Sequence, residues 1–383
     1  MRRSTTLLFG VILSSLLPST LGTISSGYIS PKQSMVDYTL GTSNENTWMI
    51  LEDLMDFNPR YPGTTGINDT AEYIHEILED TGADTSFHEF SVNGVPCRNV
   101  LGKYGAGQDA SEIIIVASHH DARARADRDP DPELRDDPVP AANDGGSSTA
   151  ILLELARIVE IMHATLDISK ETWLVFFDAE DQGSGGMQNF GWIEGSTKFA
   201  QDLDSFLEAN QSIELFMLLD MVGDDDLKID GELNSDQALL SEFFALGQCL
   251  GYSDFFPQNP VYRRITDDHV PFKTLGIPSI DIIDLDYPEW HTTKDDLDHV
   301  SKQSIGGIGR VAEGFLLRKL VGDENVTLHD PHTGYTWSEG SCNEDGLDTG
   351  FIAFIKRYWY AFLIVGVVGA SLVIVLKKQP SEV

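Results

Sequence analysis

The stretch from Thr172 to Gly183, TWLVFFDAEDQG, constrains the fold most, because a short apolar run ends there abruptly in acidic residues. Its β-branched and aromatic residues predict a strand that is buried on both faces of a parallel sheet. Asp178, Glu180 and Asp181 then lie at the carboxyl end of this strand, the edge where open α/β sheets bind ligands. A polar turn would also explain this stretch by itself, so the other strand ends decide the interpretation.

Other predicted strands also end in side chains that bind metals. The run EIIIVAS leads into His119, IELFMLL leads into Asp220, and IDIIDLDYPEW leads into His291. Asp144 precedes the glycine-rich start of a predicted helix, 149–162. Any one of these residues alone is typical of a helix cap or a hydrogen-bonded core histidine. Two imidazoles and several carboxylates at one sheet edge form a ligand set that suits zinc and leaves a position open for water or substrate.

Helical and strand-like patterns alternate along the chain and indicate one domain from about residue 44 to residue 320. The predicted helices are 47–57, 70–80 and 149–162, and the predicted strands are 86–92, 100–104, 112–118, 213–221, 280–285 and the run WLVFF. This alternation predicts an α/β fold, a three-layer αβα sandwich with a mixed, mostly parallel central sheet. Residues 124–139 lack periodicity and predict a long surface loop near the rim of the site.

The composition limits the classes of partner. The formal net charge of −35 and the pI near 4.4 argue against nucleic acid or an anionic lipid surface. With 383 residues, 41% of them hydrophobic, the chain can bury a sizeable core. Its three cysteines, Cys97, Cys249 and Cys342, allow at most one disulfide, and the sequence does not indicate whether any two of them pair.

Both ends of the sequence carry membrane signals. Residues 1–22 combine a basic start, a short apolar run and a small-residue boundary, which predicts a secretory signal peptide. Residues 358–376 form an apolar run that is opened by aromatic residues and followed by two lysines, which predicts a transmembrane helix and a cytoplasmic tail, 377–383. The polar residues 321–357 then form a juxtamembrane stalk. These signals predict a single-pass protein of the cell membrane with its catalytic domain outside.

Six short motifs follow one another along the predicted domain. They are His119-x-Asp121, Asn143-Asp144-Gly145, Glu180-Asp181, Leu219-Asp220-Met221, Asp267-Asp268-His269-Val270-Pro271-Phe272 and Trp290-His291-Thr292. Together they resemble metallopeptidase family twenty-eight, the zinc exopeptidases that include the glutaminyl cyclases. Each motif is weak alone, whereas six in order are specific. The fold of that family, a mixed sheet between helical layers, agrees with the fold predicted above.

The resemblance implies a set of metal ligands. Asp144, Asp181 and His291 match the ligands of one zinc ion. His119 and Asp220 match the residues that complete a second zinc site in the two-zinc aminopeptidases, with Asp144 shared, so the resemblance implies one zinc ion or two. One position departs from the family, because the second residue of the usual Glu-Glu pair is Asp181 here. Its carboxylate reaches less far by about one carbon–carbon bond.

The resemblance also implies residues for proton transfer and substrate binding. Glu180 matches the base that shuttles protons, and Asp121 matches the carboxylate that orients the neighbouring histidine. In the cyclase branch, the counterpart of Asp268 hydrogen-bonds near this base, and the counterpart of Trp290 forms a wall for a glutamine side chain. With a single zinc ion, Asp220 is free to bind the α-ammonium group of the substrate.

These features predict a zinc-dependent enzyme that acts on peptide N-termini, with glutaminyl-peptide cyclotransferase as the first interpretation and aminopeptidase as the second. Trp290, the pair Asp267-Asp268 and the sequences VASHHDAR and LLDMVGD favour the cyclase branch. Two features oppose it: a full two-zinc ligand set is present, and Ser118 stands where secreted animal cyclases have a disulfide cysteine. A metal-free binding ectodomain is a third alternative, which is disfavoured because no ligand position has become apolar.

Overall fold

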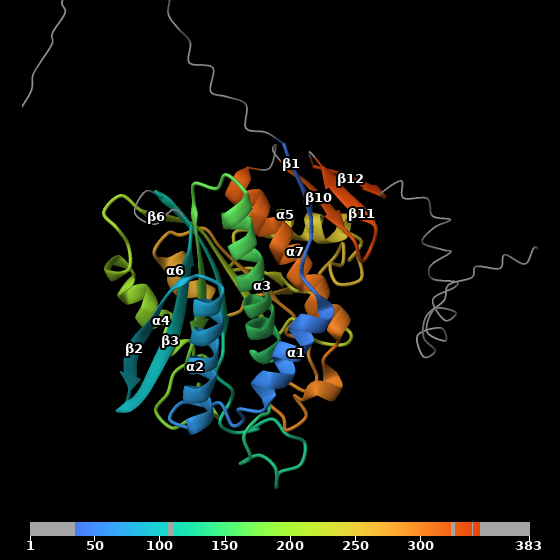
Figure 1. Cartoon of the computed structure of the whole chain (residues 1–383). Helices are drawn as coiled ribbons and strands as arrows, with labels where there is room; N and C mark the ends of the chain where they lie inside the picture. The colour runs from blue at the N-terminus through green and yellow to red at the C-terminus, as the bar shows by residue number, and fades with distance from the viewer. Residues whose placement is uncertain (1–34, 106–109, 323–325, 339, 345–383) are drawn as a thin grey trace, which may run out of the picture. The chain divides into compact units, whose positions relative to one another are not determined.

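The computed structural model describes residues 35–105, 110–322, 326–338 and 340–344. At its centre is a mixed sheet of six strands in the order β2-β3-β5-β4-β6-β9 (Figure 1). The strands are β2 (Asp84–Val92), β3 (Val95–Tyr104), β4 (Glu112–His119), β5 (Glu171–Phe177), β6 (Ser212–Asp220) and β9 (Ser279–Ile283). Four of them, β5, β4, β6 and β9, run parallel, whereas β3 is antiparallel to both of its neighbours. This arrangement agrees with the predicted mixed, mostly parallel sheet.

Alternating side chains along the central strands separate two apolar cores. In β4, Ile114 and Val116 belong to one core, whereas Ile113 and Ile115 belong to the core on the opposite face. Within the described ranges, five helices cover the first core and two cover the second. The five are α1 (Asn44–Met55), α2 (Thr65–Asp80), α3 (Gly146–Thr165), α5 (Gln237–Cys249) and α7 (Lys302–Val321), and the two are α4 (Glu194–Gln201) and α6 (His269–Thr274). The helices therefore form layers on both faces, as predicted.

Helix α3 connects the core to the predicted site. It is buried on nearly all sides, as expected of a helix inside a helical layer. Its start lies very close to the end of β4, since a Cβ atom on Gly145 would be 2.3 Å from the backbone oxygen of His119 and 2.6 Å from its Nε2. A side chain at this position would clash with backbone, so glycine is required for the approach. The close contact brings Asp144 beside His119.

The C-terminal part of the described chain forms a second sheet together with the first strand, in the order β1-β10-β11-β12. Its strands are β1 (Val36–Thr39), β10 (Val326–Asp330), β11 (Tyr335–Ser338) and β12 (Ser341–Glu344). This sheet differs from the irregular stalk predicted for residues 321–357, because Val326, Leu328 and Trp337 alternate into the main core. A disulfide between Cys249 and Cys342 links α5 to β12, and Cys97 is a buried free cysteine. Two short strands, β7 (Gly231–Glu232) and β8 (Tyr262–Arg263), pair separately.

The predicted membrane segments lie outside the described residues: the signal peptide, 1–22, the transmembrane helix, 358–376, and the tail, 377–383. In the part of the chain that the structure describes, no helix is long and apolar enough to cross a membrane. The long helices α3 and α7, with 20 residues each, carry several charged residues and pack in the helical layer. Within the described residues, the structure therefore gives no support to the predicted C-terminal transmembrane helix or to the single-pass membrane location.

Candidate metal centre

The predicted metal ligands lie together at the carboxyl edge of the central sheet. His119 and Asp220 are the last residues of β4 and β6, and Asp181 follows β5. Asp144 precedes α3, and His291 lies in the loop between β9 and α7. All five are buried. Because parallel strands end at one edge of a sheet, residues that are far apart in sequence meet there.

These five residues form two groups that share Asp144. In each group, the candidate ligand atoms lie within 4.8 Å of one another. The first group consists of Asp144, Asp181 and His291, in which His291 Nε2 lies 3.0 Å from Asp181 Oδ1 and 3.7 Å from Asp144 Oδ2. The second consists of His119, Asp144 and Asp220. Its His119 Nε2 lies 3.1 Å from both Asp144 Oδ1 and Asp220 Oδ1.

The first group fits a zinc ion by its unpaired atoms as well as by its residue types. Asp181 Oδ2 and His291 Nε2 are buried, and neither has a hydrogen-bond partner among the described residues. Buried polar atoms are nearly always paired, so two such atoms side by side indicate a missing partner. Two carboxylates and one imidazole with a fourth position open are a donor set typical of a zinc site in an enzyme.

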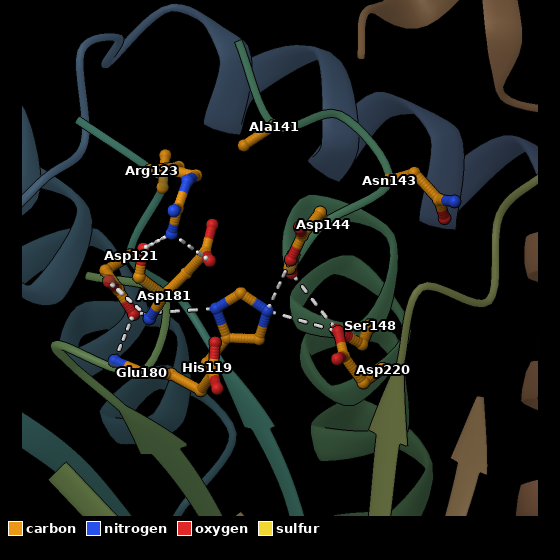
Figure 2. Close-up of polar contacts among 12 residues, drawn as sticks. His119, Asp121, Arg123, Ala141, Asn143, Asp144, Ser148, Glu180, Asp181 and Asp220 are labelled. Carbon is orange, nitrogen blue, oxygen red and sulfur yellow. Dashed lines mark hydrogen bonds and ion pairs between the residues drawn. The ribbon is translucent and has the colours of Figure 1, made fainter. Parts of the chain in front are cut away.

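Asp121 supports both groups from behind, as the resemblance implies. Figure 2 shows the ring of His119 between Asp121 on one side and Asp144 and Asp220 on the other. Asp121 Oδ1 lies 3.5 Å from His119 Nδ1 and accepts a 2.9 Å hydrogen bond from the backbone N–H of Glu180. Its Oδ2 accepts a 3.3 Å hydrogen bond from the backbone N–H of Asp181. One carboxylate therefore fixes both the imidazole and the turn that carries the proposed base.

Two supporting residues were missed from the sequence. Asp295 accepts hydrogen bonds from the backbone N–H groups of Asn143 at 2.8 Å and Asp144 at 3.2 Å, and so holds the shared ligand in place. Burial raises the pKa of Asp295 to about 8, and the charge of Asp144 adds to this shift. Arg123 Nη1 donates to Asp181 Oδ1 at 3.1 Å and to its backbone oxygen at 2.9 Å. Asp295 lies outside the six motifs, and Arg123 ends the sequence VASHHDAR, although no role was predicted for it.

The backbone beside the ligands adopts the left-handed conformation at several residues other than glycine. Ala179, Met221 and His291 have φ values of 60°, 46° and 62°. This region is rarely occupied by residues with a Cβ atom, and such residues concentrate at functional sites. Ala179 directly precedes Glu180, and Met221 directly follows Asp220. Strained turns therefore position the proposed base and the neighbouring ligand.

A cavity of about 340 Å³ opens beside these groups. It is lined by Asp144, Glu180, Asp181, Trp192, Asp220, Met221, Ile265, Thr266, Asp267, Ile283, Leu285 and Trp290. The ring centroid of Trp290 lies 4.0 Å from that of His291, and the ring of Trp192 stacks on His291 at 5.9 Å. Trp290 thus forms part of the cavity wall. Trp192 is a second aromatic wall that was missed, although an isolated tryptophan in a glycine-rich loop could have indicated it.

Burial controls the charges around the cavity. It raises the pKa of Glu180 well above its ordinary value, although the nearby His119 opposes the shift. It also raises the pKa of Asp267 to about 8, with a further contribution from Asp220. Asp268 is completely buried, and it does not line the cavity, whereas its neighbour Asp267 does. A buried carboxyl group that holds a proton near neutral pH can act as a general acid or base.

The chain is similar to known proteins over most of its described length. Residues 99–316 match Peptidase family M28. The glutaminyl-peptide cyclotransferase of Boiga irregularis is 24% identical over 295 residues, which cover 68% of this chain and 77% of that protein. The crystal structure of Porphyromonas gingivalis glutaminyl cyclase has a TM-score of 0.65 and 28% identity, covering 73% of this chain and 99% of the other. A leucine aminopeptidase precursor from Bacteroides thetaiotaomicron has a TM-score of 0.63 and 27% identity, covering 71% and 96%.

Proposed function

The chain belongs to peptidase family M28, and we propose that it is a zinc-dependent glutaminyl-peptide cyclotransferase, which converts an N-terminal glutamine to pyroglutamate and releases ammonia. One observation carries this proposal: a small cavity with two tryptophan walls contains Glu180 beside the Asp144–Asp181–His291 group. Similarity to cyclotransferases in sequence and in structure supports it. The family match bears out the predicted resemblance.

We assign the zinc ion to Asp144, Asp181 and His291, whose facing oxygen and nitrogen atoms fit it. When bound there, zinc supplies a Lewis acid that polarises the γ-amide carbonyl of the glutamine side chain. Arg123 and Asp295 hold two of these ligands in position through the hydrogen bonds described above. Two of the three ligands are thus held in position by hydrogen bonds to described residues.

The remaining chemistry is a proton transfer that Glu180 performs. Its carboxylate takes a proton from the α-amine of the substrate as the amine nitrogen bonds to the γ-amide carbon. The bond from that carbon to the amide nitrogen then breaks, and Glu180 gives the proton to the departing ammonia. Asp220, which lines the cavity, binds the α-ammonium group before the reaction, and this group releases one proton to solvent to become the nucleophilic amine. Asp268 is fully buried, so we assign it a positioning role near Glu180 and Asp267 and no contact with substrate.

The two tryptophan residues in the cavity wall favour a small, flat side chain, such as that of glutamine, at the N-terminus of the substrate. Trp192 and Trp290 both line the cavity, and both pack against the ring of His291. An N-terminal glutamine between them is shielded from water, which would otherwise compete with the α-amine as the nucleophile. The same walls leave little room for a large N-terminal side chain.

An aminopeptidase is the second candidate, and a specific observation favours it. His119, Asp144 and Asp220 form a further candidate metal group next to the first. Two metal ions that share a carboxylate are typical of hydrolytic sites, in which Glu180 would deprotonate a water molecule. The similarity to a leucine aminopeptidase precursor is consistent with this alternative.

The product of one reaction distinguishes the two functions. The purified, zinc-loaded protein is incubated with a peptide that begins with Gln, and the products are weighed by mass spectrometry. We expect the loss of one ammonia per peptide with no cleavage. Release of free glutamine would instead identify an aminopeptidase and refute the cyclotransferase proposal.

A further inference from the structure

The loop 124–139 contacts the cavity through one arginine, Arg128. Its guanidinium carbon lies 3.8 Å from the ring centroid of Trp290, which forms part of the cavity wall. Its backbone N–H donates a 3.2 Å hydrogen bond to the backbone oxygen of His291. Stacking of arginine on a tryptophan ring fixes the plane of the guanidinium group. Arg128 is therefore held against the cavity wall by both its side chain and its backbone.

Among the described residues, the side chain of Arg128 has no polar partner, unlike the side chains of the neighbouring arginines. Arg123 contacts Asp127 and Asp181, Arg125 pairs with Asp136, and Arg135 donates to a backbone oxygen. Among the described residues, no carboxylate or carbonyl oxygen is bonded to the side chain of Arg128, which is exposed.

The acidic neighbours of Arg128 in sequence are already engaged. Asp127 accepts a 2.6 Å hydrogen bond from Arg123 Nε. Asp129 accepts from the backbone N–H and the hydroxyl group of Thr293, at 3.0 Å and 2.6 Å. Neither carboxylate turns to Arg128, so its N–H donors remain available to a group that arrives from solution.

The lining of the cavity contrasts with this cation. It contains several carboxylates and, within the described residues, neither lysine nor arginine. The acidic residues are Asp144, Glu180, Asp181, Asp220 and Asp267. Such a lining attracts the α-ammonium group of the first residue and repels an acidic side chain on that residue. A cavity of about 340 Å³ holds the first residue of a peptide, so the second residue lies outside it, and Arg128 is an exposed cation that stacks on Trp290 of the cavity wall.

We propose that Arg128 is a specificity-determining residue, which binds the side-chain carboxylate of an acidic second residue in the peptide substrate. This inference rests on the proposed function, because it takes the first residue to occupy the cavity. A planar guanidinium with free donors binds a carboxylate through two parallel hydrogen bonds. At an exposed rim such a contact strengthens binding modestly, and salt weakens it. Arg128 thus offsets, for acidic peptides, the repulsion of a chain with a net charge of −35.

The test compares two peptides of nearly equal size, Gln-Glu-Ala-Phe-amide and Gln-Gln-Ala-Phe-amide. The ratio of their kcat/KM values is measured by ammonia release for the wild type and for Arg128→Gln. We expect this Glu-to-Gln ratio to be about two- to fivefold higher in the wild type at low ionic strength, which is the range of exposed ion pairs. Arg128→Glu should lower the ratio further. Arg125→Gln, which removes an exposed arginine from the same loop, should leave the ratio unchanged.

An identical ratio in the wild type and in Arg128→Gln would overturn the proposal. A purely structural effect of the substitution would lower both kcat/KM values equally and would count against it in the same way. Failure of the proposed function is recognised separately, since the wild type would then release ammonia from neither peptide. In that case, calorimetric binding of both peptides to Glu180→Gln, with and without Arg128→Gln, gives the same ratio without turnover.

Discussion

The two ligand groups share Asp144 but differ in the state of their histidines. His119 Nε2 makes a 3.1 Å hydrogen bond with Asp220. A proton on this nitrogen therefore gives the neighbouring carboxylates a hydrogen-bond donor. His291 Nε2 lies 3.0 Å from Asp181, yet it has no hydrogen-bond partner in the described part of the chain. Burial disfavours a charge on His119, but the carboxylates of Asp220, Asp121 and Asp144 together outweigh it and raise the pKa of His119 well above its ordinary value. Burial lowers the pKa of His291 to about 3.

Because the two histidines differ in this way, a complete set of ligand residues does not by itself give the number of bound metal ions. A protonated His119 can hold two carboxylates together, as a second metal ion would. A neutral His291 offers the lone pair of Nε2 to a metal ion, and this atom has no hydrogen-bond partner among the described residues. We therefore expect the His291 group to bind zinc and the His119 group to remain a hydrogen-bonded cluster.

The largest effect should follow removal of the imidazole of His291, whose Nε2 lacks a hydrogen-bond partner within the described ranges. In His291→Ala we expect zinc content to fall toward zero and kcat/KM to fall by more than about a hundredfold, because loss of a ligand exceeds the loss of a supporting residue. Metal analysis and ammonia release measure both. His299→Ala removes a partly exposed histidine that follows in the same loop region and serves as the control. Full zinc content in His291→Ala would contradict the assigned ligand set.

An effect of similar or smaller size should follow a change that leaves the metal in place. Glu180→Gln keeps the shape of the side chain but cannot shuttle a proton, so we expect kcat to fall by about 10²–10⁴-fold with zinc still bound. Glu76→Gln, an exposed glutamate on α2, is the matched control. If Glu180→Gln keeps more than about a tenth of the activity, general acid–base catalysis belongs to another residue.

The smallest effect should come from the histidine of the second group. In His119→Ala we expect zinc content to stay near that of the wild type and cyclase activity to fall by no more than about tenfold, as for a supporting residue. The same metal analysis and rate assay give the result. Parallel losses of zinc and activity in His119→Ala and His291→Ala would remove the distinction between the two groups.

The strand-end ligands could be predicted because their signals are local. An apolar run such as Glu112 to Ser118 and the histidine after it are adjacent in sequence, and the rule for parallel strands brings such ends together. Asp295 could not be predicted, because its hydrogen bond to Asn143 joins residues 152 positions apart. Trp192 and Arg123 likewise reach the site from loops whose course depends on the whole fold.

The second sheet was missed for a related reason. Strand β10 pairs with β1 in the register Val36 to Val326, so its partner comes from the opposite end of the described chain. Only alternate residues such as Val326 and Leu328 are apolar, and the residues between them face outward. Over a short polar segment, that pattern is too weak to distinguish a strand from an irregular linker. The Cys249–Cys342 disulfide became evident only once this sheet brought the two cysteines together.

The zinc content of the purified wild-type protein distinguishes a one-metal site from a two-metal site. Cyclisation uses the substrate's own amine as the nucleophile and needs one metal ion, whereas hydrolysis gains from a second. After dialysis against a zinc buffer without chelator, metal analysis should give one zinc ion per chain, and His119→Ala should give the same value. Two zinc ions per chain, one of which is lost together with the activity in His119→Ala, would contradict the account and identify a two-metal aminopeptidase.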